Sequence, residues 1–287
     1  MKPASRSLAA VRKNLDLYML LLPGLAFLIL FKYTPMYGLV ISFQDFNIFE
    51  GIGGSDWVGL DNFARLFKSE EFYRVFTNTL VISVCKIVFL FPIPIALAIM
   101  LNEVRGGLAN RGVQTIIYLP HVLSWVIIAG LFVNILSESN GIVNNLIRAV
   151  GGKPVSFLQD NAWFQAVVVF SAGWKEIGWN SIVFLAAIAG IDQEMYEAAM
   201  IDGAGRFARI FHITIPSIMS VIILMLILRI GYVLEAGTEQ ILMLYNPVVY
   251  PTGDIIGTFV YREGLGKMDY SFATAVGMFQ SLVGLVL

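Results

Sequence analysis

Long apolar runs dominate the sequence and limit the folds that it can adopt. These runs cover about 15–43, 77–101, 113–136, 163–189, 216–236 and 270–287. Each is long enough to cross roughly 30 Å of hydrocarbon as a helix. Inside a bilayer, only helices and closed barrels satisfy their own backbone hydrogen bonds, and runs of this length exclude barrel strands. The composition agrees, with 57% apolar and only 14% charged residues. We therefore expect an all-α membrane protein with six transmembrane helices.

The distribution of basic residues predicts which side of the membrane each segment occupies. Positive charge gathers before the first run and in the short loop 102–112, where only Glu103 opposes it. The basic residues concerned are Lys2, Arg6, Arg12, Lys13, Arg105 and Arg111. Because cytoplasmic segments carry an excess of lysine and arginine, we expect a multi-pass protein with a cytoplasmic N-terminus. The first run is too long for a cleaved secretory signal. Segments 44–76, 137–162 and 237–269 are then expected as outer loops.

Several classes of function are excluded by what the sequence lacks. A net charge of −1 and a pI near 6.1 give no sign of a nucleic-acid partner. Cys85 is the only cysteine, and His121 and His212 lack metal-ligand spacing, so no metal site is expected. No phosphate-binding loop, HExxH, Ser-His-Asp or paired-carboxylate pattern stands out. We therefore expect a chain that is not an enzyme, binds no cofactor of its own and works within the lipid bilayer.

A polar segment interrupts the apolar runs between the fourth and fifth expected spans. Gly190 and Asp192 are typical of the end of one helix and the N-cap of the next, which would cover about 193–202. Gly203 allows a turn, and a second amphipathic helix follows. Such a segment could lie on the bilayer surface, but surface helices have a basic polar face and this one is acidic. We expect 190–215 to be a cytoplasmic helix-turn-helix that contacts a partner.

The residue identities in this segment resemble the EAA loop of binding-protein-dependent ABC importer permeases. The Glu-Ala-Ala triplet 197–199 is followed after three residues by Gly203. Ile213, Ile215 and Pro216 then come at the family's spacing. In that family the loop forms the coupling helix that docks onto the ATPase subunit, so the resemblance implies a power source outside this chain.

The resemblance extends along nearly the whole chain. Further segments look like the oligosaccharide-importing branch, which includes the maltose-type and LplB-type permeases. They are NEVRGG (102–107), VQTIIYLPHVLSW (113–125), WKEIGWNSIVFLAAIAGID (174–192), EQILMLYNP (239–247) and YSFATAVGMFQSLVGL (270–285). The chain departs from the family at Ile215, which replaces the usual leucine, and at Ser220, where many members have a second proline. We expect one permease domain over 1–287. Because the last span stops at Leu287 without a polar tail, we also expect the native chain to run further.

The family implies a set of partners in the bacterial cytoplasmic, or inner, membrane. They are a second homologous permease subunit, two cytoplasmic ABC ATPase subunits that bind ATP and Mg, an extracytoplasmic solute-binding protein and an oligosaccharide substrate. By the family's pattern, the residues that couple the chain to the ATPase are Glu197, Ala198, Ala199, Asp202, Gly203, Ala204 and Arg206. Glu197 would face a basic residue of the ATPase.

Polar residues inside the spans form a second group of candidates. Ionisable groups at bilayer depth are costly, and they commonly face a cavity or a polar pathway. Lys86 is one of them. The residues expected along the substrate path are Trp174, Lys175, Glu176, Trp179, Asn180 and Arg229. Aromatic faces and amide groups suit a sugar. Two alternatives stay open, because the tryptophans could be packing residues and the charges could form structural pairs.

Together these features predict a non-catalytic permease subunit of an ATP-driven importer, which translocates oligosaccharides delivered by a solute-binding protein. A permease for a polyol or for glycerol phosphate is the nearest alternative. An ATP-independent secondary transporter should show an inverted repeat or an intramembrane coupling-ion site, and the sequence shows neither. The intramembrane charges argue against a purely structural membrane protein.

Overall fold

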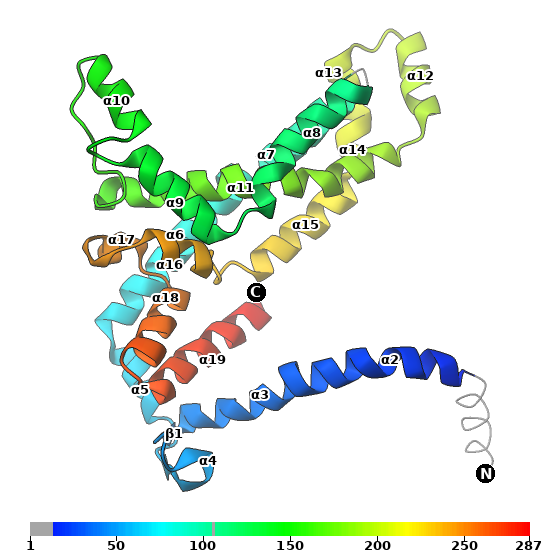
Figure 1. Ribbon diagram of the computed structural model, residues 1–287. Coiled ribbons are helices and arrows are strands. Elements are labelled where there is room, and N and C mark those ends of the chain that lie inside the picture. Colours follow the sequence, from blue (N-terminus) through cyan, green and yellow to red (C-terminus); the bar gives the residue numbers. More distant parts are fainter. Residues whose placement is uncertain (1–13, 105–106) are drawn as a thin grey trace, which may run out of the picture. The chain divides into compact units, whose positions relative to one another are not determined.

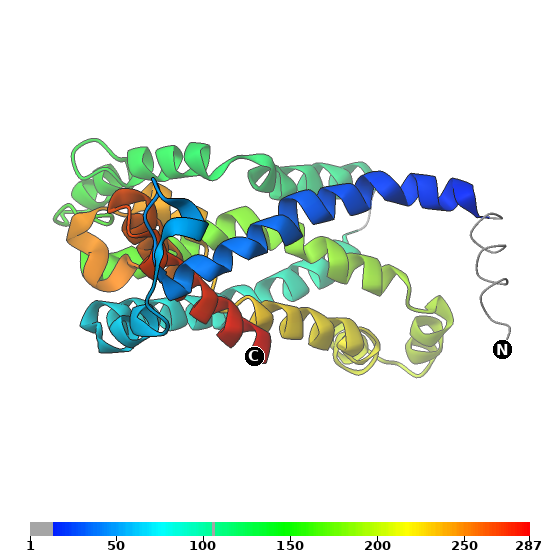
Figure 2. The ribbon, with the colours of Figure 1, turned by 90° about the horizontal axis from the view of Figure 1, so that it is seen from below.

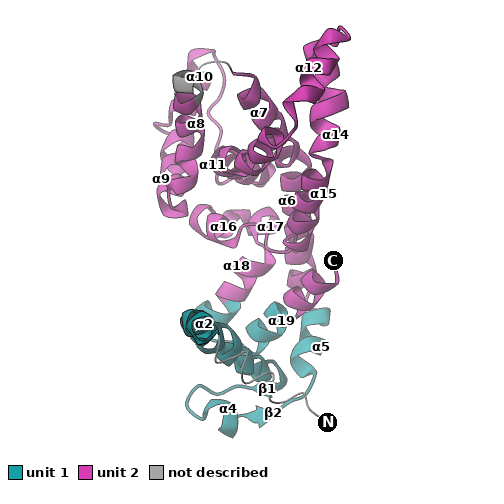
Figure 3. Ribbon diagram, turned by 90° about the vertical axis from the view of Figure 1, so that its right-hand side faces the viewer, with its two compact units in different colours: residues 1–68, 263–278 teal, residues 69–262, 279–287 magenta. Residues whose placement is uncertain are grey.

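The computed structural model describes residues 14–104 and 107–287, and its regular structure is mostly helical, as expected (Figure 1). The chain divides into two compact units (Figure 3). Unit 1 comprises residues 1–68 and 263–278, and unit 2 comprises 69–262 and 279–287. Five of the basic residues behind the predicted orientation lie outside the described residues. They are Lys2, Arg6, Arg12, Lys13 and Arg105.

Unit 1 begins with a continuous helical run over Leu15–Phe43. Its parts are α2 (Leu15–Leu28), the π-helical η1 (Ile29–Tyr33), α3 (Thr34–Met36) and the 3-10 helix η2 (Tyr37–Phe43). A short antiparallel pair follows, in which β1 (Gln44–Asp45) and β2 (Asp56–Trp57) flank α4 (Gly51–Gly54), and α5 (Asp61–Lys68) comes next. Arg65 of α5 forms an ion pair of 2.6 Å with Asp269 and lies 4.2 Å from the ring centroid of Phe272. This contact joins the two sequence segments of unit 1.

Unit 2 holds the longest helices of the described chain. The first are α6 (Glu70–Leu90), α7 (Pro92–Glu103), α8 (Gly107–Val122), α9 (Trp125–Leu136), α10 (Ile142–Ala149) and α11 (Asn161–Ala189). Helices α6 and α7 form one run of 34 residues, in which Pro92 occupies the first position of α7, where its missing N–H costs nothing. The C-terminal helix α19 (Tyr270–Val286) begins in unit 1 and ends in unit 2.

The described helices include fewer clear membrane spans than the six expected. By length and composition, Leu15–Phe43 and Glu70–Glu103 can each cross a membrane, and up to four spans result if each of two bent helix pairs counts as one. Helix α11 has 29 residues, but Lys175, Glu176 and Asn180 make its middle polar. Helix α19 is a shorter apolar helix. The six-span count therefore stays a prediction.

The expected third span, 113–136, is not one straight helix. Residues 111–122 and 125–136 meet at an angle of 100° (Figure 1). The physical reason is local, because Ser124 is extended and its hydroxyl accepts a hydrogen bond of 3.4 Å from the Ile127 N–H. Ser124 is thus the N-cap of a new helix, α9, and a serine in that role starts a helix more readily than it continues one.

The expected fifth span, 216–236, is also interrupted. Helix α15 (Met219–Gly231) meets the preceding helical segment at 61° and ends five residues before Ala236. The chain then turns, and Ala236 adopts a φ of 47°. Glu235 therefore lies in a turn beyond the end of the helix.

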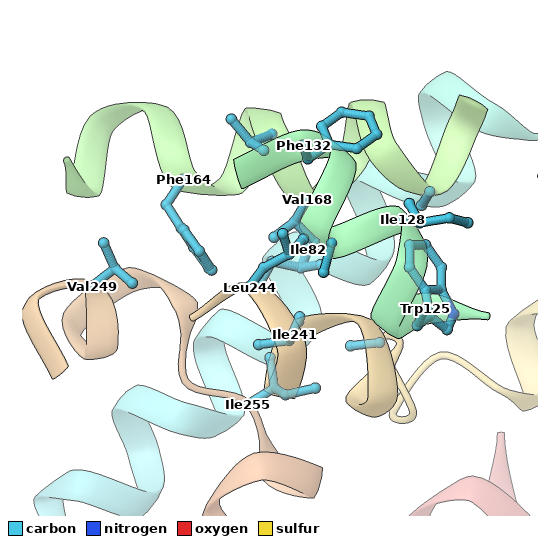
Figure 4. Packing of buried hydrophobic residues seen from close by; sticks show 14 residues of the cluster. Ile82, Trp125, Ile128, Phe132, Phe164, Val168, Ile241, Leu244, Val249 and Ile255 are labelled. Atoms are coloured by element: carbon cyan, nitrogen blue, oxygen red, sulfur yellow. The ribbon is translucent and has the colours of Figure 1, made fainter. Parts of the chain in front are cut away.

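The expected outer loop 237–269 is mostly helical, and its part within unit 2, residues 237–262, contributes to the core of that unit. It contains α16 (Thr238–Leu244), η4 (Pro247–Val249), α17 (Tyr250–Gly253), α18 (Ile256–Tyr261) and the π-helical η5 (Arg262–Gly266). Ile241, Leu244, Val249 and Ile255 pack with buried side chains of α6, α9 and α11 (Figure 4). The segment is therefore packed and helical rather than an irregular loop, and its position outside the membrane stays a prediction.

A buried ion-pair network holds the same segment to α6. Asp254 has no exposed surface, and its carboxylate lies 2.8 Å from the guanidinium of Arg262. Arg262 also lies 2.8 Å from Glu71 at the start of α6, and its guanidinium stacks 4.8 Å from the ring centroid of Tyr250. Both charges of the buried pair are thus compensated, as burial requires.

The polar segment between α11 and α15 folds as a helix-turn-helix. It comprises α12 (Gln193–Ile201), α13 (Arg206–Arg209), the π-helical η3 (Ile210–Thr214) and α14 (Ile215–Ser217). Helices α12 and α10 lie at opposite ends of unit 2 in both ribbon views (Figures 1 and 2).

Candidate functional site

Helix α12 is built by local signals at both of its ends. The Asp192 carboxylate caps its start by accepting a hydrogen bond of 3.0 Å from the Glu194 N–H. At its end Gly203 has a φ of 81°, and the Ala204 N–H donates to the Ala199 carbonyl at 2.8 Å. This is the Schellman arrangement, which a glycine accommodates without strain. The predicted helix and turn are therefore both present.

The outward face of α12 is available to a partner. All nine residues of α12 are described and none of them is buried, and Ile201 is 87% exposed. The side chains of Glu197 and Ala198 are exposed, while Ala199 is half-buried. Tyr196 anchors the opposite face through a hydrogen bond of 2.9 Å between its hydroxyl and that of Thr214. Asp202 and Gly203 are exposed, and Ala204 is half-buried.

Arg206 differs from the other expected coupling residues, because it has a partner within the chain. Its Nε and Nη2 donate to the same carboxylate oxygen of Glu103, at 2.9 and 2.6 Å. Glu103 is the last residue of α7, so this pair ties the helix-turn-helix to the end of the α6–α7 run. The helix-turn-helix and the end of α7 therefore lie at the same end of unit 2.

Lys175 of α11 fills the break between α8 and α9. Its Nζ donates to the His121 carbonyl at 3.0 Å and also to the Leu123 carbonyl, and it lies 5.3 Å from the ring centroid of Trp125. Carbonyls at a helix end lack partners within the helix, and a cation there is favourable. Lys175 is therefore a cap for α8, and its contact with a substrate stays a prediction.

Lys86 of α6 has a similar position at the turn after α15. Its Nζ donates to the Ala236 carbonyl at 2.9 Å and to Gln240 Oε1 at 2.6 Å. The Gln240 amide in turn donates to the Val168 carbonyl at 2.6 Å and the Ser171 hydroxyl at 2.7 Å. The network links α6, α11 and α16, and it satisfies the irregular backbone that a membrane interior would otherwise not tolerate.

Glu176, Asn180 and Arg229 come together around two neighbouring cavities of unit 2. The larger, of about 400 Å³, is lined by Asn180 and Arg229, and the smaller, of about 170 Å³, by Glu176 and Arg229. Arg229 Nη2 lies 3.5 Å from the Glu176 carboxylate. Tyr232 and Glu235 line both cavities. Neither residue was predicted for the substrate path, because the turn that carries them was expected to be part of a span.

The two tryptophans expected along the substrate path lie away from these two cavities, and their contact with a substrate stays a prediction. Trp174 packs edge-on against Phe132, with ring centroids 6.0 Å apart, in an apolar groove of about 460 Å³. Trp179 stacks on His121 at 4.4 Å, and their planes differ by only 4°. Neither lines the two polar cavities. Among the described residues, no group of three His, Cys, Asp or Glu side chains could hold a metal ion.

Comparisons with known proteins cover nearly the whole chain. The family described as "Binding-protein-dependent transport system inner membrane component" matches residues 91–287. The chain is 45% identical to Protein LplB of Bacillus subtilis (strain 168), over 98% of this chain and 88% of that protein. It is 46% identical to the polygalacturonan/rhamnogalacturonan transport system permease protein YteP of the same organism, over 94% of this chain and 84% of that protein. It also resembles a chain in the crystal structure of a bacterial ABC transporter involved in the import of the acidic polysaccharide alginate. There the TM-score is 0.91 and the identity 43%, over 98% of this chain and 95% of that chain.

Proposed function

Because the chain belongs to the family of binding-protein-dependent transport system inner membrane components, we propose that it is a permease that moves acidic oligosaccharides across the bacterial inner membrane. It is a permease of the sugar- and oligosaccharide-importing ABC kind, and the full-length similarity to YteP and to the alginate importer carries this conclusion. The acidic character follows from the alginate importer, whose substrate is an acidic polysaccharide.

The chain crosses the membrane six times, with its N-terminus and α12 in the cytoplasm. The spans are 15–43, α6–α7, α8–α9, α11, α13–α15 and α19. One contact and the position of α10 support the same side of the membrane for the short loop after α7 and for the helix-turn-helix. Arg206 bonds Glu103 at the end of α7, and α10, from a predicted outer loop, lies at the other end of unit 2 (Figure 2).

Helix α12 is the coupling helix. Its exposed Glu197 and Ala198 contact the cytoplasmic ATPase, together with Ala199 and the turn residues 202–204. The sequence has no phosphate-binding loop, so ATP and Mg are bound by two ATPase subunits. A second permease completes the membrane part, and a solute-binding protein delivers the sugar. Along the path, Glu176, Asn180 and Arg229 meet the substrate, while Trp174, Lys175 and Trp179 line the helices beside it.

Substrate class is tested by uptake into proteoliposomes that contain the chain with its partner permease and ATPase, with the binding protein outside. We expect ATP-dependent uptake of trigalacturonate, and little uptake of maltotriose or glycerol 3-phosphate. Uptake of only a neutral or phosphorylated probe would overturn the acidic class. Accumulation without ATP would instead indicate a secondary transporter.

The coupling role of α12 is tested by Glu197→Lys. Because Glu197 is exposed on the partner-facing side, reversing its charge leaves the fold intact and should abolish ATP-driven uptake and weaken copurification of the ATPase. Glu197→Gln, which keeps the shape and removes only the charge, should have an intermediate effect. Normal uptake and normal copurification of the ATPase with the Glu197→Lys variant would contradict the coupling role of α12.

A further inference from the structure

Arg229 is held more weakly than three other buried or half-buried cations of unit 2, namely Lys86, Lys175 and Arg262. Lys86 and Lys175 each donate to two oxygen acceptors, and Arg262 has two carboxylate partners at 2.8 Å. The ion-pair partner of Arg229 is Glu176, at 3.5 Å. A charge-assisted N–H···O bond is usually about 2.7–2.9 Å. Much of the hydrogen-bonding capacity of the guanidinium is therefore left over.

The space beside Arg229 can take a ligand. Arg229 lines both polar cavities, and its side chain is 37% exposed, while that of Glu176 is 29% exposed. An arginine at bilayer depth is costly without a counterion. Glu176 supplies that counterion when nothing else is bound, but at a distance that leaves the pair easy to separate.

We propose that Arg229 binds carboxylate groups of the passing sugar, and that Glu176 is the resident counterion which Arg229 leaves when a carboxylate arrives. This rests on the proposed function. The planar guanidinium forms two parallel hydrogen bonds to a carboxylate, which a hydroxyl cannot match. Arg229 is thus a specificity-determining residue, which separates anionic from neutral sugars.

The charged groups beside Arg229 keep the site balanced in charge when Arg229 leaves Glu176 for a sugar carboxylate. Lys86 and Glu176 both line the smaller cavity, so Glu176 keeps a cation nearby when Arg229 turns to the sugar. Tyr232 is 62% exposed and offers a ring face to a sugar ring. The exposed carboxylate of Glu235 repels an anionic sugar. That repulsion favours release, because transport requires binding weak enough to reverse.

The test measures sugar binding to the purified permease–ATPase complex. The binding protein is left out, so that the measurement reports only the preference of the membrane part for acidic over neutral sugars. The probes are trigalacturonate and its methyl ester, which has the same backbone without charge. We expect the wild-type complex to prefer trigalacturonate by about 10- to 100-fold, the range for a hydrogen bond to a charged group. Arg229→Gln should remove the preference, because it weakens the binding of trigalacturonate and leaves the binding of the methyl ester unchanged. Glu176→Gln should tighten acid binding.

Arg74→Gln is the matched control. Arg74 is also loosely paired, 3.6 Å from Glu71, but it lines neither cavity. Its loss should leave the preference unchanged, and basal ATP hydrolysis reports whether each variant assembles. Equal wild-type binding of acid and ester, or a preference that survives Arg229→Gln, would overturn the role of Arg229. Uptake through the full importer tests the proposed function separately.

Discussion

The contact between α8 and α11 depends on a missing side chain at Gly178. A Cβ added there would lie 2.2 Å from the Ile117 carbonyl oxygen and 2.5 Å from Ile117 Cγ2. The shortest comfortable carbon–oxygen contact is about 3.3 Å, so the helices would have to separate by roughly 1 Å. Gly178→Ala therefore adds one carbon atom at the contact between α8 and α11.

The size of the effect follows from two opposing contributions. Overpacking costs about 1–3 kcal/mol, and the upper part of that range applies because a backbone oxygen cannot rotate away as a side chain can. Alanine in a helix interior is favoured over glycine by up to about 1 kcal/mol. For Gly178→Ala we expect a net loss of stability of about 1–2 kcal/mol.

The assay is thermal unfolding of the purified complex in detergent, with Gly130→Ala as the control. Gly130 lies inside α9, and a Cβ added there meets nothing within 4 Å. The control should melt at or slightly above the wild-type temperature, and Gly178→Ala clearly below it. Gly178→Val should melt lower still. If Gly178→Ala were as stable as Gly130→Ala, the close approach of the two helices would be refuted.

Three further substitutions test two contacts of the same unit. Lys175→Met leaves the carbonyls at the α8 break without their donor, which should cost about 1–3 kcal/mol in the same melting assay; an unchanged melting temperature would show that the cap is dispensable. Glu103→Arg or Arg206→Glu breaks an exposed ion pair worth under about 1 kcal/mol, so uptake should fall while stability hardly changes. Combining the two reversals should restore uptake, and a double variant no better than either single one would argue against this link.

The helix-turn-helix could be predicted from sequence because its signals are local. Asp192 caps the helix that begins beside it, and Gly203 adopts the positive φ that ends it. Each signal acts over a few residues, so no tertiary information is needed. Local signals do not predict that Arg206 pairs with Glu103, which lies about a hundred residues earlier.

The helix breaks could not be predicted from hydropathy, because an apolar run does not record where its helix bends. Ser124 is polar but small, and it lies within an otherwise apolar segment. Its role as an N-cap could not be recognised from the sequence. The carbonyls at the end of the preceding helix accept hydrogen bonds from Lys175, which lies on the distant helix α11. The segment 237–269 was expected as a loop for the converse reason. Its helices are too short to cross a membrane, although their apolar faces are buried against α6, α9 and α11.

Position within an apolar run did not rank the charged residues as candidates for substrate contact, and the number and length of their contacts rank them better. Lys86 and Lys175 are nearly buried. Their ammonium groups already donate hydrogen bonds to backbone carbonyls and, for Lys86, to the side-chain amide oxygen of Gln240. A lysine that already caps a helix end would have to leave an unpaired carbonyl in order to bind a sugar, at a cost of about 1–3 kcal/mol. Arg229 gives up only a contact of 3.5 Å with Glu176, and it lines both cavities. Binding a sugar carboxylate therefore costs least at Arg229, while Lys175 holds the break between α8 and α9 and Lys86 holds the turn that lines both cavities.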